Sequence, residues 1–174
     1  MTKFCLTDSQ NSWEILDSWE SLNITKGLLV NEYQNWGKLY TVELEITVTN
    51  RGDGYSNIFH FIADGDSIPA LGIRSNGLFV ISSSINGNGN YGKEINFELD
   101  KKYQMIIKQC EANGAYWFET IVDGESNIKI ENKQPQSFSS VKFYASNPTN
   151  PAFLGSISNV KIQQGCIDNV TISK

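Results

Sequence analysis

The sequence predicts an all-β protein folded as a two-sheet antiparallel β-sandwich. Apolar residues fall on every second position in successive short runs, which is the pattern of half-buried strands. Glycine, asparagine and aspartate interrupt these runs, as turns between antiparallel strands require. No window keeps apolar residues at the i, i+3, i+4 and i+7 positions of a helix. Together these observations favour two packed sheets over a helical architecture.

Turn signals separate the predicted strands from one another. Asn76-Gly77 lies between two alternating runs and is the strongest short-range hairpin signal, while Asp64-Gly65-Asp66 closes the run before them. We expect residues 86–92, which are rich in Asn and Gly, to form a loop. The predicted strands cover residues 28–30, 40–48, 58–63, 70–74, 78–83, 95–99, 103–108, 116–122, 140–144 and 158–162.

Length and charge limit the class of protein. A chain of 174 residues can bury most of the surface that its unfolded form exposes, so we expect one domain over residues 1–174 with its core at about residues 13–162. Fourteen Lys and Arg stand against 19 Asp and Glu, a net charge of −5, which gives little support for nucleic-acid binding. No apolar run approaches the roughly 20 residues that span a bilayer, and residues 1–8 lack the apolar core of a signal peptide. We expect a soluble chain without membrane insertion.

The segments follow one another in an informative order: an opening strand at 40–48, the runs 59–62, 68–74 and 76–80, the strands 103–108 and 118–124, and a closing strand at 153–162. This order resembles the concanavalin A-like jelly roll, and within it the laminin-G-like branch, over about residues 13–162. The resemblance implies a recognition or adhesion module that presents rim loops, or the concave face of one sheet, to a glycan or a protein.

The resemblance also implies a candidate calcium site at the rim. Many laminin-G-like domains hold Ca²⁺ with an Asp from a loop after an early strand and an Asn or Asp from a late loop. The matching positions here are Asp64 or Asp66 with Asn147. Such oxygen donors suit Ca²⁺ rather than a soft metal. The alternative is that residues 64–66 form an ordinary turn whose side chains cap backbone amides.

Glycan binding needs a flat apolar face for the sugar ring and converging amides or hydroxyls. His60 and Arg74 alternate with apolar neighbours, so they project away from the core side of their strands. The candidate ligand-binding residues are Trp36, His60, Arg74, Asn86, Asn88, Asn90 and Tyr91. The competing interpretation is that Trp36 packs in the core, that residues 86–92 form a flexible hairpin tip, and that His60 is a satisfied side chain on a polar face.

An enzyme is the first alternative, since the same fold class includes glucanases. Glu43 and Glu45 alternate on one strand and could act as the acid and nucleophile of a glycoside hydrolase. The glucanase signature, however, needs an Asp between two Glu residues four apart, and Thr47 and Thr49 stand in the places that would complete it. A Ser or Cys nucleophile would depend on His60, the single histidine. We therefore expect no enzymatic activity.

A second alternative is a structural protein that self-associates into homo-oligomers through exposed strand edges. The state of the cysteines depends on the cellular compartment. Cys5, Cys110 and Cys166 cannot all pair within one chain, and their spacing matches no zinc motif. A jelly roll often brings its termini together, so in an oxidising compartment Cys5 and Cys166 could pair and leave Cys110 free. A cytoplasmic protein with three reduced thiols is the open alternative to the extracellular module that we expect.

Overall fold

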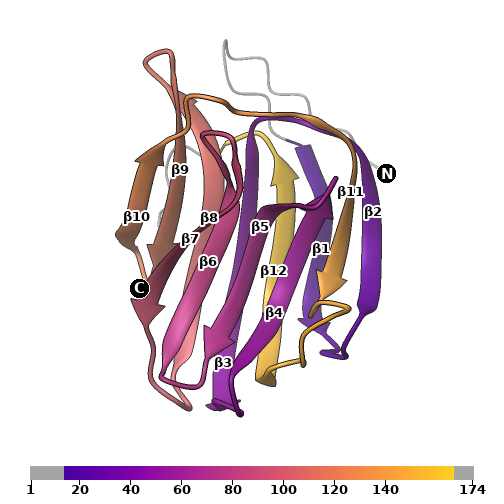
Figure 1. The fold of residues 1–174 in the computed structure, drawn as a ribbon, viewed down its shortest axis with the longest axis vertical. Helices are drawn as coiled ribbons and strands as arrows, with labels where there is room; N and C mark the ends of the chain where they lie inside the picture. The colour runs from indigo at the N-terminus through magenta and orange to yellow at the C-terminus, as the bar shows by residue number, and fades with distance from the viewer. Residues whose placement is uncertain (1–13, 167–174) are drawn as a thin grey trace.

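The computed structural model describes residues 14–166, which form twelve β-strands (Figure 1). In this part of the chain no helix is long and apolar enough to cross a membrane. The strands are β1 (Glu14–Leu22), β2 (Leu28–Trp36), β3 (Tyr40–Asn50), β4 (Tyr55–Ala63), β5 (Asp66–Arg74), β6 (Leu78–Ile85), β7 (Asn88–Asn96), β8 (Lys102–Ala112), β9 (Ala115–Val122), β10 (Glu125–Glu131), β11 (Phe138–Ala145) and β12 (Leu154–Gln164).

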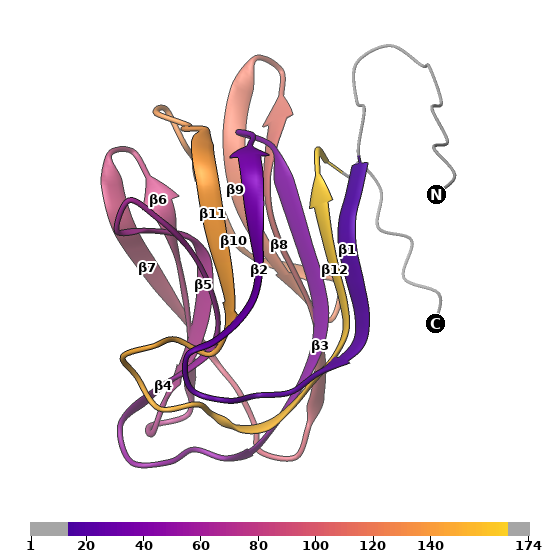
Figure 2. The same ribbon diagram turned by 90° about the vertical axis from the view of Figure 1, so that its right-hand side faces the viewer.

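The strands pair into two six-stranded antiparallel sheets. The first sheet has the order β1-β12-β3-β8-β9-β10, and the second has the order β2-β11-β4-β5-β6-β7. Seen from the side, the two sheets form separate layers that face each other (Figure 2). The two-sheet antiparallel β-sandwich predicted from the sequence is confirmed.

The core lies between the two layers and is rich in aromatic rings. Phe61 of β4 and Phe143 of β11 stack with their ring centroids 4.4 Å apart. Burying one such ring stabilises the folded state by roughly 1.5–3 kcal/mol. Because side chains alternate across a strand, a residue next to a core phenylalanine points to the opposite face of its sheet. The alternation that buries these rings therefore directs their strand neighbours His60 and Tyr144 outward.

Two-residue turns explain why Asn-Gly and Asp-Gly pairs punctuate the chain. At Asn86 and Gly87 both φ angles are positive, 54° and 78°. This is the turn geometry that matches the twist of two antiparallel strands. Asn, Asp and Gly adopt it at lower cost than other residues. Positive φ angles at both positions also occur at residues 64–65, 113–114 and 123–124.

The predicted loop at residues 86–92 is wrong, because only Asn86 and Gly87 form the turn and β7 begins at Asn88. The ladder with β6 holds this glycine-rich segment in an extended conformation, so tertiary pairing overrides its weak strand propensity. At Gly89 a Cβ would collide with the carboxylate of Asp66, which accounts for a glycine inside the strand. Of the predicted strand at 95–99, only residues 95 and 96 are strand, at the end of β7.

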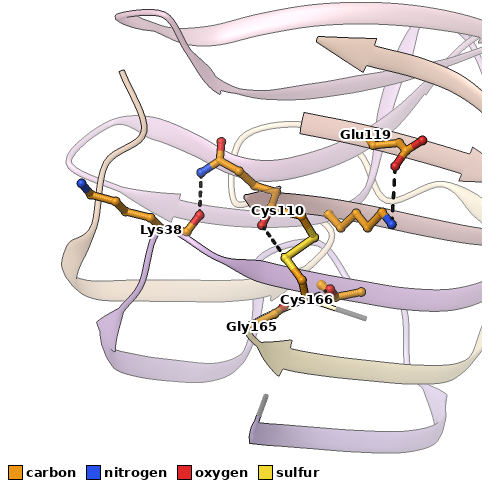
Figure 3. Close-up of a disulfide and its surroundings, with 8 residues drawn as sticks. Lys38, Cys110, Glu119, Gly165 and Cys166 are labelled. Carbon is orange, nitrogen blue, oxygen red and sulfur yellow. Dashed lines mark hydrogen bonds and ion pairs between the residues drawn. A yellow bond between two sulfur atoms is a disulfide. The ribbon is translucent and has the colours of Figure 1, made fainter. Parts of the chain in front are cut away.

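A disulfide joins Cys110 of β8 to Cys166, just after β12 (Figure 3). Gln109 and Gln164 both pair with Tyr40, the first residue of β3, one from each side. The segments that carry the two cysteines therefore meet across β3, and their Cα atoms lie 5.5 Å apart. The pairing of Cys166 with Cys5 that an oxidising compartment would allow, with Cys110 left free, is wrong, and so is the alternative of three reduced thiols. Cys5 itself lies outside the described residues.

Candidate functional site

The candidate site lies on the outer face of the second sheet, the face that points away from the core. On β4, Phe59 and Phe61 belong to the core and His60 lies between them. On β11, Phe143 is buried and Tyr144 follows it. His60 and Tyr144 are directly opposite each other in the β4–β11 pairing. The alternation of the two strands thus places an imidazole and a phenol ring next to each other on this face.

His60 is the centre of a series of hydrogen bonds, which we call the His60 chain. Its Nδ1 lies 2.6 Å from Nδ2 of Asn147, and its Nε2 lies 3.0 Å from Oγ of Ser67. The Ser67 hydroxyl donates to Oδ1 of Asn90 at 2.9 Å. The His60 chain therefore links β4, β5, β7 and the segment after β11 through four side chains.

The partners of the His60 chain fix the direction of each hydrogen bond. Oδ1 of Asn147 accepts from the backbone N–H of Thr149, so Nδ2 of Asn147 faces His60 and donates to its Nδ1. Ser67 has one hydroxyl proton, which goes to Asn90, so its oxygen accepts from Nε2–H of His60. The imidazole is therefore neutral, with its proton on Nε2.

Burial lowers the pKa of His60 from 6.5 to about 4, because desolvation disfavours the charged ring. A proton on Nδ1 would also point at the amide hydrogens of Asn147, so charging the ring would break that hydrogen bond. At neutral pH His60 is a fixed, uncharged group that holds Ser67 and, through it, Asn90.

Ser67 and His60 have the separation of a nucleophile and its base, but the hydrogen bond between them runs in the opposite direction. A general base accepts the serine proton on the nitrogen that faces the hydroxyl, and here that nitrogen carries a proton of its own. Ser67 is also only 2% exposed. The pair is arranged to position Asn90 rather than to attack a substrate bond.

A hollow of about 380 Å³ is lined by Tyr144, the cross-strand neighbour of His60, and we call it the Tyr144 hollow. Tyr144 is half-buried, whereas Asp64 and Lys142 are exposed and bring opposite charges to the same hollow. The hydroxyl of Ser140 donates to Oε1 of Glu32 at 2.6 Å, so its oxygen stays free to accept. The remaining residues of the lining are Ile62, Ala63, Gly65 and Ser139.

Small residues occupy the middle of this face. Across the sheet, His60 is followed in register by Ala70, Ser82 and Gly92 on β5, β6 and β7. None of the three has a side chain that extends far above the sheet. The row leads from the ring of His60 to the free edge at β7.

Arg74 lies on β5 at the end of the same face. Its Nε is 2.7 Å from Oε1 of Glu94, and the two side chains are 52% and 42% exposed. The ring of Tyr55 covers Gly72, where a Cβ would collide with it. Arg74 is thus exposed as predicted from the sequence, but an acidic partner already occupies its guanidinium.

Trp36 cannot present its ring to a ligand, which corrects its assignment as a binding residue. The side chain is 0% exposed. It packs against Tyr33, Tyr40 and Phe61, with ring centroids 5.3–5.6 Å apart. Polar residues precede Trp36 in the sequence, but the residue itself closes β2 with its ring in the core.

Only one of the three predicted asparagines belongs to the His60 chain, namely Asn90. Asn86 bonds backbone groups at the end of β10 and just beyond it, and Oδ1 of Asn88 accepts from the N–H of Asn90. Tyr91 is half-buried and packs against the core. The structure therefore does not gather Asn86, Asn88 and Tyr91 around a common ligand position.

The residues predicted for calcium do not converge on one point. Asp64 directly follows β4, whereas Asn147 follows β11, whose last residue, Ala145, pairs with Phe59. Because the two strands are antiparallel, Asp64 and Asn147 lie toward opposite ends of the paired segment.

The predicted calcium ligands also have protein partners of their own. Asp66 accepts from the Ser84 hydroxyl at 2.9 Å, and the Asn147 amide is used by His60 and Thr149. Within residues 14–166, no group of three or more His, Cys, Asp or Glu side chains is placed to hold a metal ion. Asp64 belongs to a two-residue turn, which agrees with the alternative interpretation of residues 64–66.

Glu43 and Glu45 are on β3 of the first sheet, not on the sheet of the His60 chain. The hydrogen bond from Nζ of Lys102, 2.8 Å away, lowers the pKa of Glu45. Glu43 accepts from Nε2 of Gln163 at 2.8 Å. A glycosidase acid needs a raised pKa. Oε1 of Glu43 also lies 3.9 Å from Nζ of Lys161, so each carboxylate has a lysine as its ion-pair partner.

Sequence reasoning missed Ser67, Lys142 and Tyr144. Alternation in residues 140–144 is enough to place Lys142 and Tyr144 on one face of a strand. It cannot show that this strand lies next to β4, because that pairing joins residues far apart in the chain.

No protein-family model and no curated protein matches this sequence. Solved structures do resemble its fold. The Trypanosoma rangeli sialidase in complex with 2,3-difluorosialic acid superposes with a TM-score of 0.56 and 14% identity, over 82% of this chain and 26% of that one. The heptameric SAP-like pentraxin from Limulus polyphemus gives 0.50 and 14%, over 82% and 73%.

A third neighbour, the receptor-binding domain of botulinum neurotoxin type G, gives a TM-score of 0.50 and 13% identity over 87% of this chain and 42% of that one. The fold is a concanavalin A-like jelly roll. This confirms the fold predicted from the sequence, while the laminin-G-like branch stays a prediction. The chain spans 20–26% of the length of the Trypanosoma sialidases that it resembles.

Proposed function

We propose that this chain is a non-enzymatic recognition module that binds carbohydrate, free or on a glycoprotein, on the outer face of its second sheet. The observation that carries the proposal is the Tyr144 hollow together with its place beside the His60 chain. The jelly-roll fold agrees with such a role but does not by itself specify it.

The Tyr144 hollow offers the two kinds of contact that a sugar needs. The ring of Tyr144 provides an apolar face, and serine hydroxyls with Asp64 and Lys142 provide donors and acceptors for sugar hydroxyls. Because Tyr144 is half-buried, its ring loses little conformational freedom when a ligand binds.

The His60 chain adds a rigid polar surface next to the hollow. Each of its hydrogen bonds has one possible direction, so the buried Ser67 holds the exposed Asn90 in place before any ligand arrives. Groups that are positioned in advance bind a ligand at lower entropic cost. A neutral His60 also lets this surface keep the same hydrogen-bonding pattern at neutral and mildly acidic pH.

Recognition outside the cell is part of this proposal. The Cys110–Cys166 disulfide supports it, since disulfides persist mainly in oxidising compartments. Among the structural neighbours, the toxin domain is described as a receptor-binding domain, which is a recognition role. Neighbours that are sialidases match only through a minor part of their length, and the surroundings of Glu43, Glu45 and Ser67 favour a binding role over catalysis.

A glycan array tests the proposal directly. The wild-type protein should bind a restricted set of glycans, Tyr144→Ala should abolish the signal, and Tyr144→Phe should keep most of it because the ring remains. Tyr116→Ala, on β9 of the first sheet, is the matched control and should bind as the wild type does. The array is run in Ca²⁺ and in chelator, and because the predicted calcium ligands are separated we expect equal signals. A featureless array would overturn the proposal.

A further inference from the structure

A second hollow of about 310 Å³ adjoins the Tyr144 hollow, and Ser139 lines both. We call it the Phe138 hollow. Its lining comes from the end of β2 and the start of β11, and consists of Asn35, Trp36, Gly37, Ser137, Phe138 and Ser139. Ser139 is exposed and lies where the two hollows meet.

The two hollows differ in charge. The Tyr144 hollow has Asp64 and Lys142 in its lining, whereas the residues of the Phe138 hollow carry no formal charge. Phe138 is half-buried and packs in part against the core, whereas Ser137 and Asn35 are exposed polar residues. The Phe138 hollow therefore offers a ligand mainly hydroxyl and amide groups, beside the accessible part of one ring.

The combined length exceeds that of a single sugar ring. Phe138 and Tyr144 belong to the same strand, β11, and six residues of extended chain span about 20 Å. A monosaccharide can fill one hollow but cannot reach both. Only a ligand with several rings in line can occupy both hollows at once.

We propose that the two hollows form one groove along β11 that takes an oligosaccharide of at least two sugar units, with an uncharged unit over the Phe138 hollow. This inference rests on the proposed function of the Tyr144 hollow. A second unit bound on the same groove acts as an intramolecular contact, so affinity rises with chain length. The gain from one to three units is about tenfold or more, which corresponds to about 1.4 kcal/mol.

Three variants separate the parts of the groove. Ser139→Trp fills the junction, and Ser137→Trp fills only the Phe138 hollow, since Ser137 lines no part of the other. Ser156→Trp places the same side chain at an exposed position on β12 of the first sheet and serves as the matched control. Circular dichroism and thermal unfolding show whether each variant folds.

The experiment is a calorimetric titration with cello-, chito- and manno-oligosaccharides of one to four units. The oligosaccharides that bind on the array are titrated in the same way, together with their component monosaccharides. We expect longer ligands to bind the wild type about tenfold or more tightly than the monosaccharide. Ser137→Trp should remove this gain and leave monosaccharide binding within about twofold. Ser139→Trp should also remove it, and Ser156→Trp should change neither value.

Two results would overturn the inference, and they are distinct from failure of the proposed function. If affinity is the same for one and four units, the ligand occupies the Tyr144 hollow alone. If Ser137→Trp and Ser139→Trp leave the gain intact while Tyr144→Ala abolishes binding, the further units bind outside the Phe138 hollow. If no glycan binds, the proposed function fails and the groove fails with it.

Discussion

Nδ2 of Asn147 donates to Nδ1 of His60 at 2.6 Å, although the two residues are 87 positions apart in the chain. This contact determines which imidazole nitrogen carries the proton. It also turns His60 from a potential base into a fixed donor toward Ser67. The segment after β11 thereby determines which groups of the His60 chain donate hydrogen bonds and which accept them.

The Asn147→Asp substitution tests this control. A carboxylate oxygen facing Nδ1 would stabilise a protonated ring, so the pKa of His60 should rise above its wild-type value of about 4. The chain has a single histidine, so its ring signals in a proton NMR titration are unambiguous. A wild-type His60 that titrates near the ordinary 6.5, or an unchanged pKa in the variant, would contradict the hydrogen-bond directions of the His60 chain.

The low pKa of His60 predicts how stability depends on pH. Between about pH 6.5 and pH 4 the unfolded chain binds a proton at this residue that the folded chain does not bind. The part of the free energy of unfolding that depends on a neutral His60 is therefore fully present above pH 6.5 and is lost as the pH falls toward 4. Its size is at most about 3 kcal/mol. Urea unfolding of wild type and His60→Gln at both ends of this range measures this pH-dependent part of the free energy of unfolding. If the free energy of unfolding changes with pH in the same way in both proteins, the role of His60 is refuted.

Asp17 of β1 and Tyr33 of β2 join the two sheets, since the Tyr33 hydroxyl donates to Oδ2 of Asp17 at 2.9 Å. Burial, and next the hydrogen bond to Asp17, raise the pKa of Tyr33. Asp17→Ala leaves a buried hydroxyl without this partner, so the free energy of unfolding should fall by about 1–3 kcal/mol. Adding Tyr33→Phe should recover part of the loss. Additive effects in this double-mutant cycle would show that the bond contributes nothing.

The Cys110–Cys166 disulfide should stabilise the sandwich strongly. It closes a loop of 56 residues, for which the chain-entropy model gives about 4 kcal/mol. The Cys110→Ser, Cys166→Ser double variant should therefore unfold at lower denaturant concentration than the wild type. Peptide mapping without reductant should recover Cys110 and Cys166 in one linked pair. Recovery of Cys166 linked to Cys5 would contradict this assignment.

Much of the fold could be predicted because it depends on local patterns. Period-two hydrophobicity places His60 and Arg74 on the outer side of their strands, and Asn-Gly and Asp-Gly pairs mark turns. The exceptions are segments where pairing decides the conformation. Residues 88–92 resemble a loop in composition, yet the ladder with β6 makes them strand, and β10 is absent from the strands that the sequence predicts.

The candidate site was harder to predict, because its contacts join distant segments. The polar neighbours of Trp36 suggest a ligand contact, whereas only the packing of β2 against β4 shows that its ring is in the core. Asn147 is predicted as a calcium ligand, and only the structure shows that its amide bonds to His60. The cysteine pairing needs the strand order around β3, which local patterns do not contain.

We propose that the outer face of the second sheet binds carbohydrate at Tyr144. An NMR titration of isotope-labelled wild-type protein with the glycan that binds most strongly on the array tests this binding. We expect the largest amide shifts at Tyr144, Ser140 and Asp64, which line the hollow, and saturation at a single site. Shifts confined to the first sheet around Glu43 and Glu45, or no saturable shift with any glycan, would contradict the claim.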